Sequence, residues 1–143
     1  MENKYIITVI GTQEVEGEKD KIEVVTTGDY IEKNGHLYIK YKEYDSENPN
    51  ISLDTVVKVE GDNKVSIIRM GDRPSRLILE KDVRHQCHYM TAMGSLMMGV
   101  YTSKITNELN DNGGDIRVKY QLSFFADHVS NNEFHINVKK KEE

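Results

Sequence analysis

The sequence has little of what small disulfide-stabilised or membrane-anchored proteins depend on. Its 143 residues contain one cysteine, Cys87, so no intrachain disulfide can form. A chain of this length buries roughly 70% of its unfolded surface and needs no such cross-link. The apolar run at 5–10 is too short for a signal-peptide core or a membrane span. We therefore expect one cytoplasmic domain over residues 1–143, with 139–143 as a charged flexible tail.

An excess of positive charge is also missing. The chain has 24 acidic and 19 basic residues, a net charge of −5, and its lysines and glutamates are interleaved. Nucleic-acid-binding proteins usually show a basic patch, because neutralising phosphates supplies most of their non-specific affinity. The one basic run, at 139–141, is followed directly by two glutamates. The composition predicts neither a nucleic-acid partner nor a membrane partner, and it leaves the oligomeric state open.

Helical periodicity is absent as well, and an alternation with period two takes its place. Between residues 37 and 42, Leu37, Ile39 and Tyr41 alternate with polar or exposed positions. The dipeptide Asn34-Gly35 precedes them and suits a type I′ hairpin turn, whose two central residues need positive φ. Similar strands are predicted at 22–31, 54–60, 65–67, 77–80, 85–93, 96–106, 116–124 and 134–138. Only 103–109 is compatible with a helical turn, and 110–114 is predicted to be a loop.

Many short strands joined by turns predict an all-β fold. Sequential hairpins form a meander, and closing the sheet removes its unpaired edges. The predicted architecture is a single antiparallel up-and-down β-barrel of about eight to ten strands with little or no helix.

An ordered set of segments resembles the YwiB-like family of uncharacterised bacterial proteins. The set comprises 26–30, 37–41, 56–59, 65–71 with Arg69, Tyr89 with Gly94 and Leu96, Thr102, Ile105, Gly113-Gly114 and 116–122. The resemblance implies a calycin-like barrel related in shape to lipocalins, and it implies no assigned activity. Lipocalins carry a Gly-x-Trp signature on their first strand. This chain has no tryptophan, which argues against a lipocalin-type transport role.

The segment His85-Gln86-Cys87-His88 is the first candidate for chemistry. On a strand His85 and Cys87 share a face and His88 takes the other, which leaves two ligands where a structural zinc ion needs four. The spacing of the remaining histidines, His36, His128 and His135, does not predict convergence. Cys87 and His88 point to opposite faces and cannot easily form a nucleophile pair. We expect no metal and no catalytic residue.

Other catalytic and cofactor motifs are weak. The methionines Met90, Met93, Met97 and Met98 flank the turn expected at Gly94 and are predicted to pack around it. Gly113-Gly114 lacks the Lys-Ser or Lys-Thr of a phosphate-binding loop. The sequence therefore predicts no cofactor and no enzyme.

One constellation points to binding. Arg69 keeps the phase of Val65 and Ile67, which should face inward. The candidate lumen set consists of Arg69 with Tyr30, Tyr41, Tyr89 and Tyr120, all in phase with apolar neighbours. Either Arg69 lies at a strand end with its charge in water, or it anchors a ligand inside the barrel, unless an internal carboxylate such as Glu80 is its acceptor.

Three functions remain open in this order. The first is a non-catalytic barrel that binds one small, partly apolar and anionic ligand. The second is a structural or protein-interaction barrel whose interior is filled by its own side chains. An enzyme is third.

Overall fold

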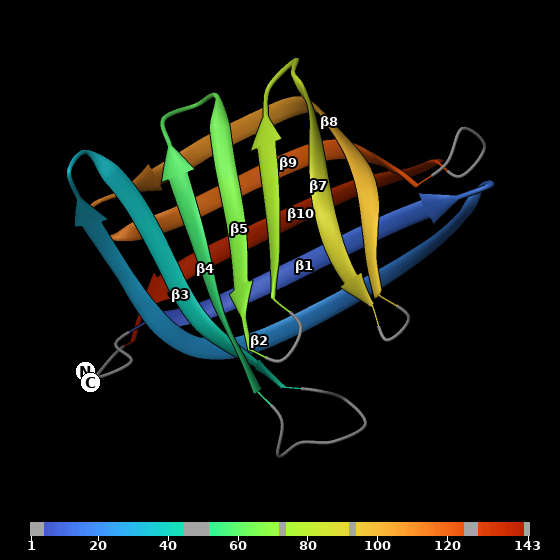
Figure 1. Cartoon of the computed structure of the whole chain (residues 1–143). Helices are drawn as coiled ribbons and strands as arrows, with labels where there is room; N and C mark the ends of the chain where they lie inside the picture. Colours follow the sequence, from blue (N-terminus) through green and yellow to red (C-terminus); the bar gives the residue numbers. More distant parts are fainter. Residues whose placement is uncertain (1–4, 45–51, 72–73, 92–93, 125–128, 142–143) are drawn as a thin grey trace.

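A computed structural model describes residues 5–44, 52–71, 74–91, 94–124 and 129–141 (Figure 1). These residues form ten antiparallel strands and no helix, which confirms the predicted all-β class and strand number. The strands are β1 (Tyr5–Val15), β2 (Glu18–Lys33), β3 (His36–Tyr44), β4 (Ser52–Glu60), β5 (Lys64–Met70), β6 (Ser75–Glu80), β7 (Arg84–Thr91), β8 (Gly94–Asn110), β9 (Gly113–Ser123) and β10 (Val129–Lys140). No helix in the described ranges is long and apolar enough to cross a membrane.

Several element boundaries differ from those expected. Residues 103–109 continue β8, so the helical turn suggested there is wrong. The loop expected at 110–114 is shorter, because Gly113 and Gly114 already pair with Lys139 and Val138 as the start of β9. For the same reason β10 runs through Lys140, and its last residues belong to the sheet instead of a tail.

Two-residue turns join β1 to β2 and β2 to β3. The Asn34-Gly35 hairpin predicted from the sequence is present, with φ of 55° and 82°. Glu16 and Gly17 form an equivalent turn with φ of 51° and 84°. Both turns therefore have the type I′ signature that matches the twist of paired strands.

The sheet closes where the first and last strands meet. Its order is β6-β5-β4-β3-β2-β1-β10-β9-β8-β7, so neighbours in the sheet are neighbours in sequence except at the β1–β10 pair. The two marginal strands are β6 and β7. They are joined by a short turn, whose Asp82 N–H donates to the Thr102 carbonyl of β8 over 2.8 Å. The result is a nearly closed barrel.

No ladder joins β6 to β7 within the described residues. Figure 1 shows the two strands diverging from their shared turn toward the Ser75 end of β6. We call this gap the seam. The side chains that line it come from both faces of the sheet, because an unpaired gap exposes the interior as well as the outer wall.

One apolar cluster fills the barrel. The inward positions alternate along each strand, as the period of two predicts. Its fully buried members include Ile7, Ile39, Val57, Val65, Leu79, Val100, Ile116, Val118 and Ile136. Strand β2 adds no side chain to the fully buried set; its inward-facing Gly28 is packed against Ile7 and the backbone of β3 instead.

The contact at Gly28 generates a stability prediction. A Cβ atom there would lie 2.1 Å from the Lys40 carbonyl oxygen and 2.5 Å from Ile7 Cδ1, so strand β3 would have to shift. We expect Gly28→Ala to lower the free energy of unfolding by about 1–3 kcal/mol, measured by urea denaturation. Gly11→Ala is the matched control, because a Cβ atom there meets nothing within 4 Å. Equal stability of the two variants would contradict this packing.

Candidate functional site

A polar cluster occupies the inner wall beyond the apolar core. Register places Arg69 of β5 opposite Thr55 of β4, and Thr55 opposite Tyr41 of β3. Glu43 lies two residues after Tyr41 and therefore shares its inward face. We call Tyr41, Glu43, Thr55 and Arg69 the Arg69 cluster.

A single carboxylate oxygen organises this cluster. Arg69 Nε donates to Glu43 Oε2 over 2.9 Å, and Thr55 Oγ1 donates to the same oxygen over 2.8 Å. Thr55 is 1% exposed, whereas the side chains of Arg69 and Glu43 are 37% and 27% exposed. The pair therefore lies at the boundary between the interior and solvent.

Glu43 favours the charged form of Arg69. Burial by itself would lower the pKa of Arg69, but attraction to Glu43 and the hydrogen bond to it outweigh that penalty and raise the pKa. The guanidinium keeps its charge, and Glu43 occupies its Nε group. The structure assigns no acceptor among the described residues to its two Nη groups.

Two of the four candidate tyrosines lie within electrostatic range of Arg69. Burial raises the pKa values of Tyr41 and Tyr120, and the positive charge of Arg69 partly offsets both increases. Tyr120 comes from β9 on another part of the wall, where its ring meets Phe134 edge to face at 6.1 Å. Arg69 therefore has an electrostatic influence on phenols from two separate strands.

The other two tyrosines do not extend this cluster. Tyr30 donates its hydroxyl proton to the Asn110 carbonyl over 2.7 Å and packs against Tyr5. Burial, followed by the charge effects of Tyr5 and of nearby acids, raises the pKa of Tyr30 to about 12. The structure thus places Tyr30 in a separate contact with the end of β8. The Tyr89 side chain lies outside the described residues.

Glu43 is the residue that sequence reasoning missed. The acceptor considered there was Glu80, which instead lies 2.8 Å from His85 Nε2. The available signal was the phase of β3, because Leu37, Ile39, Tyr41 and Glu43 alternate in step. An internal carboxylate is therefore an acceptor of Arg69, but it is Glu43 and not Glu80.

A groove follows the seam outside this ion pair. Its volume is about 500 Å³. The lining residues are Ile68, Arg69, Met70, Pro74, Ser75, Arg76, Ile78, Gln86, Cys87 and His88. Arg69 and Cys87 enter the groove from the interior, and Ser75, which pairs with Arg69, shares the inward face. Ile68, Met70, Arg76, Ile78, Gln86 and His88 have the opposite phase and flank it on the outer face. The described lining includes two arginines and no acidic residue.

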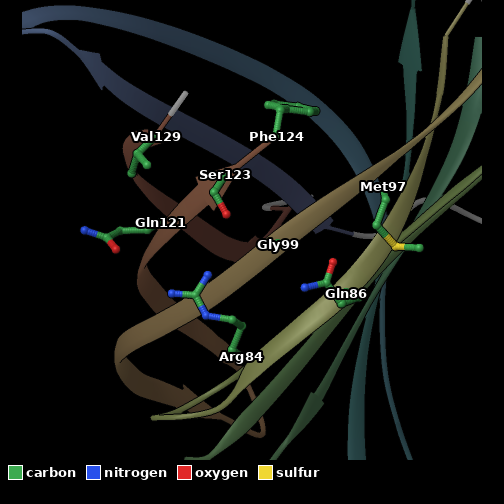
Figure 2. Close-up of a pocket in the computed structure, with 8 residues that line it drawn as sticks. All are labelled: Arg84, Gln86, Met97, Gly99, Gln121, Ser123, Phe124 and Val129. Carbon is green, nitrogen blue, oxygen red and sulfur yellow. The ribbon is translucent and has the colours of Figure 1, made fainter. Parts of the chain in front are cut away.

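A second hollow of about 420 Å³ lies on the outer face of β7 to β10 (Figure 2). Arg84 from β7 and Ser123 from β9 reach toward each other across Gly99 of β8. A Cβ atom at Gly99 would lie 2.7 Å from Ser123 Oγ, so glycine makes this approach possible. The hollow is polar and open, and among its lining residues Phe124 also packs against the core cluster.

Three of the four described histidines, His36, His85 and His135, lie beside separate carboxylates, whereas His88 Nδ1 lies 3.3 Å from Ser95 Oγ. His85 bonds Glu80, and His135 Nε2 lies 2.7 Å from Asp115 Oδ1. The hydrogen bonds from Asn137 and His135 lower the pKa of Asp115. The described ranges contain no group of three residues arranged as metal ligands. Cys87 is buried and His88 is exposed, so the two lie on opposite faces as their spacing predicts.

Comparison with known proteins places the chain in a family. Residues 7–136 match the model described as a domain of unknown function (DUF1934). This chain belongs to the DUF1934 family. The crystal structure of the ywiB protein from Bacillus subtilis has a similar fold, with a TM-score of 0.85 and 21% identity, over 98% of this chain and 93% of that one. The YwiB-like resemblance is therefore confirmed. A search of the curated proteins finds no match.

A double-mutant cycle tests the pair at the centre of the cluster. We expect Arg69→Leu and Glu43→Leu each to lower the free energy of unfolding by about 1–3 kcal/mol, because each strands a partly buried charge. The double variant should lose less than the sum, as measured by urea denaturation. Arg117 and Glu108 form the control cycle, since their side chains are 46% and 60% exposed and should couple by less than about 1 kcal/mol. Additivity at Arg69 and Glu43 would contradict the assignment.

The single thiol provides a second test. Cys87 is 4% exposed, so we expect native protein to react slowly with a thiol reagent and unfolded protein to react at once. A variant carrying Cys87→Ala and Lys104→Cys is the control, because Lys104 is exposed. Rapid stoichiometric labelling of the native parent would contradict the assignment of Cys87 to the inward face of β7.

Proposed function

We propose that this domain binds one small, partly apolar anion in the seam groove and does no chemistry on it. The observation that carries the proposal is the place of Arg69. Arg69 lines a groove whose surface is largely apolar, and Glu43 engages its Nε group. The volume of about 500 Å³ falls within the roughly 300–1,000 Å³ typical of small-molecule sites.

The geometry of the guanidinium supports an anionic head group. A guanidinium presents two edges, and Glu43 engages the Nε group of Arg69. The two Nη groups can then receive a carboxylate in the paired geometry that arginine favours. Arg76 lies on the same groove, and none of the described lining residues is acidic. The local charge therefore favours an anion although the whole chain has a net charge of −5.

The apolar part of the ligand would lie along the seam. Ile68, Met70 and Ile78 line the groove, and methionine adapts to chains of different shape. The interior is filled by side chains of the core cluster, so the ligand would occupy the wall of the barrel and not its centre. This position differs from the lumen site expected from the sequence.

A matched pair of probes tests the proposal. Decanoate and decanol share a chain and differ in the charge of the head group. We expect decanoate to bind more tightly, and Arg69→Leu to weaken decanoate at least about tenfold, or ~1.4 kcal/mol, with little effect on decanol. Isothermal titration calorimetry measures both. Arg117→Leu, on the outer face of β9, should change neither affinity.

Labelling of Cys87 locates the ligand. Because Cys87 lines the groove, bound decanoate should slow its reaction further, and decanoate should lose this effect in Arg69→Leu. Arg69→Lys keeps the charge without the fork and should give an intermediate affinity for decanoate. It replaces Arg69→Leu in the experiment if that variant is unstable. A parent that binds neither probe would favour the rival function, a structural or interaction barrel.

A further inference from the structure

Strand β2 is much longer than β3, which pairs with one of its two edges. Glu18 through Gly28 of β2 pair with β1, but β3 pairs only with Gly28 through Lys33. Residues 18–27 therefore have a second edge to which no described strand is paired. Figure 1 shows this hairpin running past the ends of β3 to β7.

The turns on either side determine which backbone groups face this edge. In two-residue hairpins the residues flanking the turn form a hydrogen-bonded pair. Val15 with Glu18 and Lys33 with His36 are these pairs. Because the pattern alternates, even-numbered residues of 18–27 bond to β1. The N–H and C=O groups that face the free edge belong to Lys19, Lys21, Glu23, Val25 and Thr27.

Apolar side chains are unusually exposed along the same stretch. Ile22 is 68% exposed and Val25 is 66% exposed. Glu18 through Val25 are all exposed, which is the longest such run on any strand with a described burial pattern. A long edge with unpaired backbone groups and exposed β-branched residues is a template for another strand.

We propose that a second copy of this chain pairs with this edge, so that two β2 strands run antiparallel across a twofold axis centred on Ile22. The proposal concerns 18–26 of each copy and is independent of the seam groove. The two sheets would become continuous through hydrogen-bonded pairs of Lys19 with Val25 and Lys21 with Glu23, each formed twice by symmetry.

Charge selects this register. Residues whose N–H and C=O groups face the free edge must pair with residues of the same kind in the second copy. The twofold axis must therefore pass through a residue position. An axis at Lys21 would place two lysines opposite each other, and an axis at Glu23 would do the same with two glutamates. The axis at Ile22 places Lys21 opposite Glu23 on both sides, and opposite charges directly across strands are favourable.

The same register pairs the most exposed apolar residue with itself. Ile22 would face Ile22 of the second copy in a non-hydrogen-bonded pair, where side chains lie closest. Lysines at an edge discourage pairing with an arbitrary strand. The order Lys21 then Glu23 favours a partner with the reverse order, which an antiparallel copy of the same strand supplies.

A charge swap tests the interface in the full chain. Sedimentation velocity over a concentration series should show a monomer–dimer equilibrium for the parent. Glu23→Lys places Lys21 opposite a lysine, and Lys21→Glu places Glu23 opposite a glutamate. Either change should weaken dimerisation at least tenfold, and the double variant Lys21→Glu with Glu23→Lys should restore it.

Glu32→Lys is the matched control, because Glu32 is exposed on the same strand but lies where β3 pairs. It should leave the dimer intact, and circular dichroism should show the same β spectrum for every variant. A parent that stays monomeric at all concentrations would overturn the proposal and leave the edge to a different partner. A dimer that is insensitive to Glu23→Lys, or a double variant that stays monomeric, would overturn it equally.

Discussion

The pairing of β1 with β10 is the constraint on which the rest of the barrel depends. Ten residue pairs join the two strands, from Tyr5 with Lys140 to Glu14 with Asn131. Because this ladder unites the first and last strands, the discontinuity of the sheet falls between β6 and β7. In a simple open meander the two unpaired edges belong to the first and last strands. Here the gap lies in the middle of the sequence, beside Arg69 and Cys87.

The seam also explains how the protein tolerates charge on an inward face. An arginine and a glutamate deep in the apolar cluster would be expensive to desolvate. Arg69 and Glu43 meet at the margin of that cluster, where both side chains keep partial contact with water. Thr55 is the fully buried member, and it needs only one acceptor for its hydroxyl proton. Polarity therefore increases from the apolar interior through Thr55 to the open seam.

Local patterns in the sequence predicted much of this arrangement, and non-local ones did not. Alternation identified the strands and gave Arg69 its inward phase, because side-chain direction follows directly from period two. Glu43 keeps the same phase, yet an acidic residue close to a strand end reads as exposed until its partner is known. The free edge of 18–27 could not be predicted from the sequence, because it depends on how far β3 pairs along β2. The seam likewise depends on which distant strands meet.

The closing ladder has a consequence for the order of assembly. Contacts between β1 and β10 join residues more than a hundred positions apart in the sequence, so the chain must pay nearly the whole loop-closure entropy before they form. Folds dominated by such distant contacts reach the native state slowly. During synthesis β1 emerges first and waits for its partner until almost all other strands have left the ribosome. Until then the apolar face around Ile7 is protected on one side only, by the early β1–β2 hairpin.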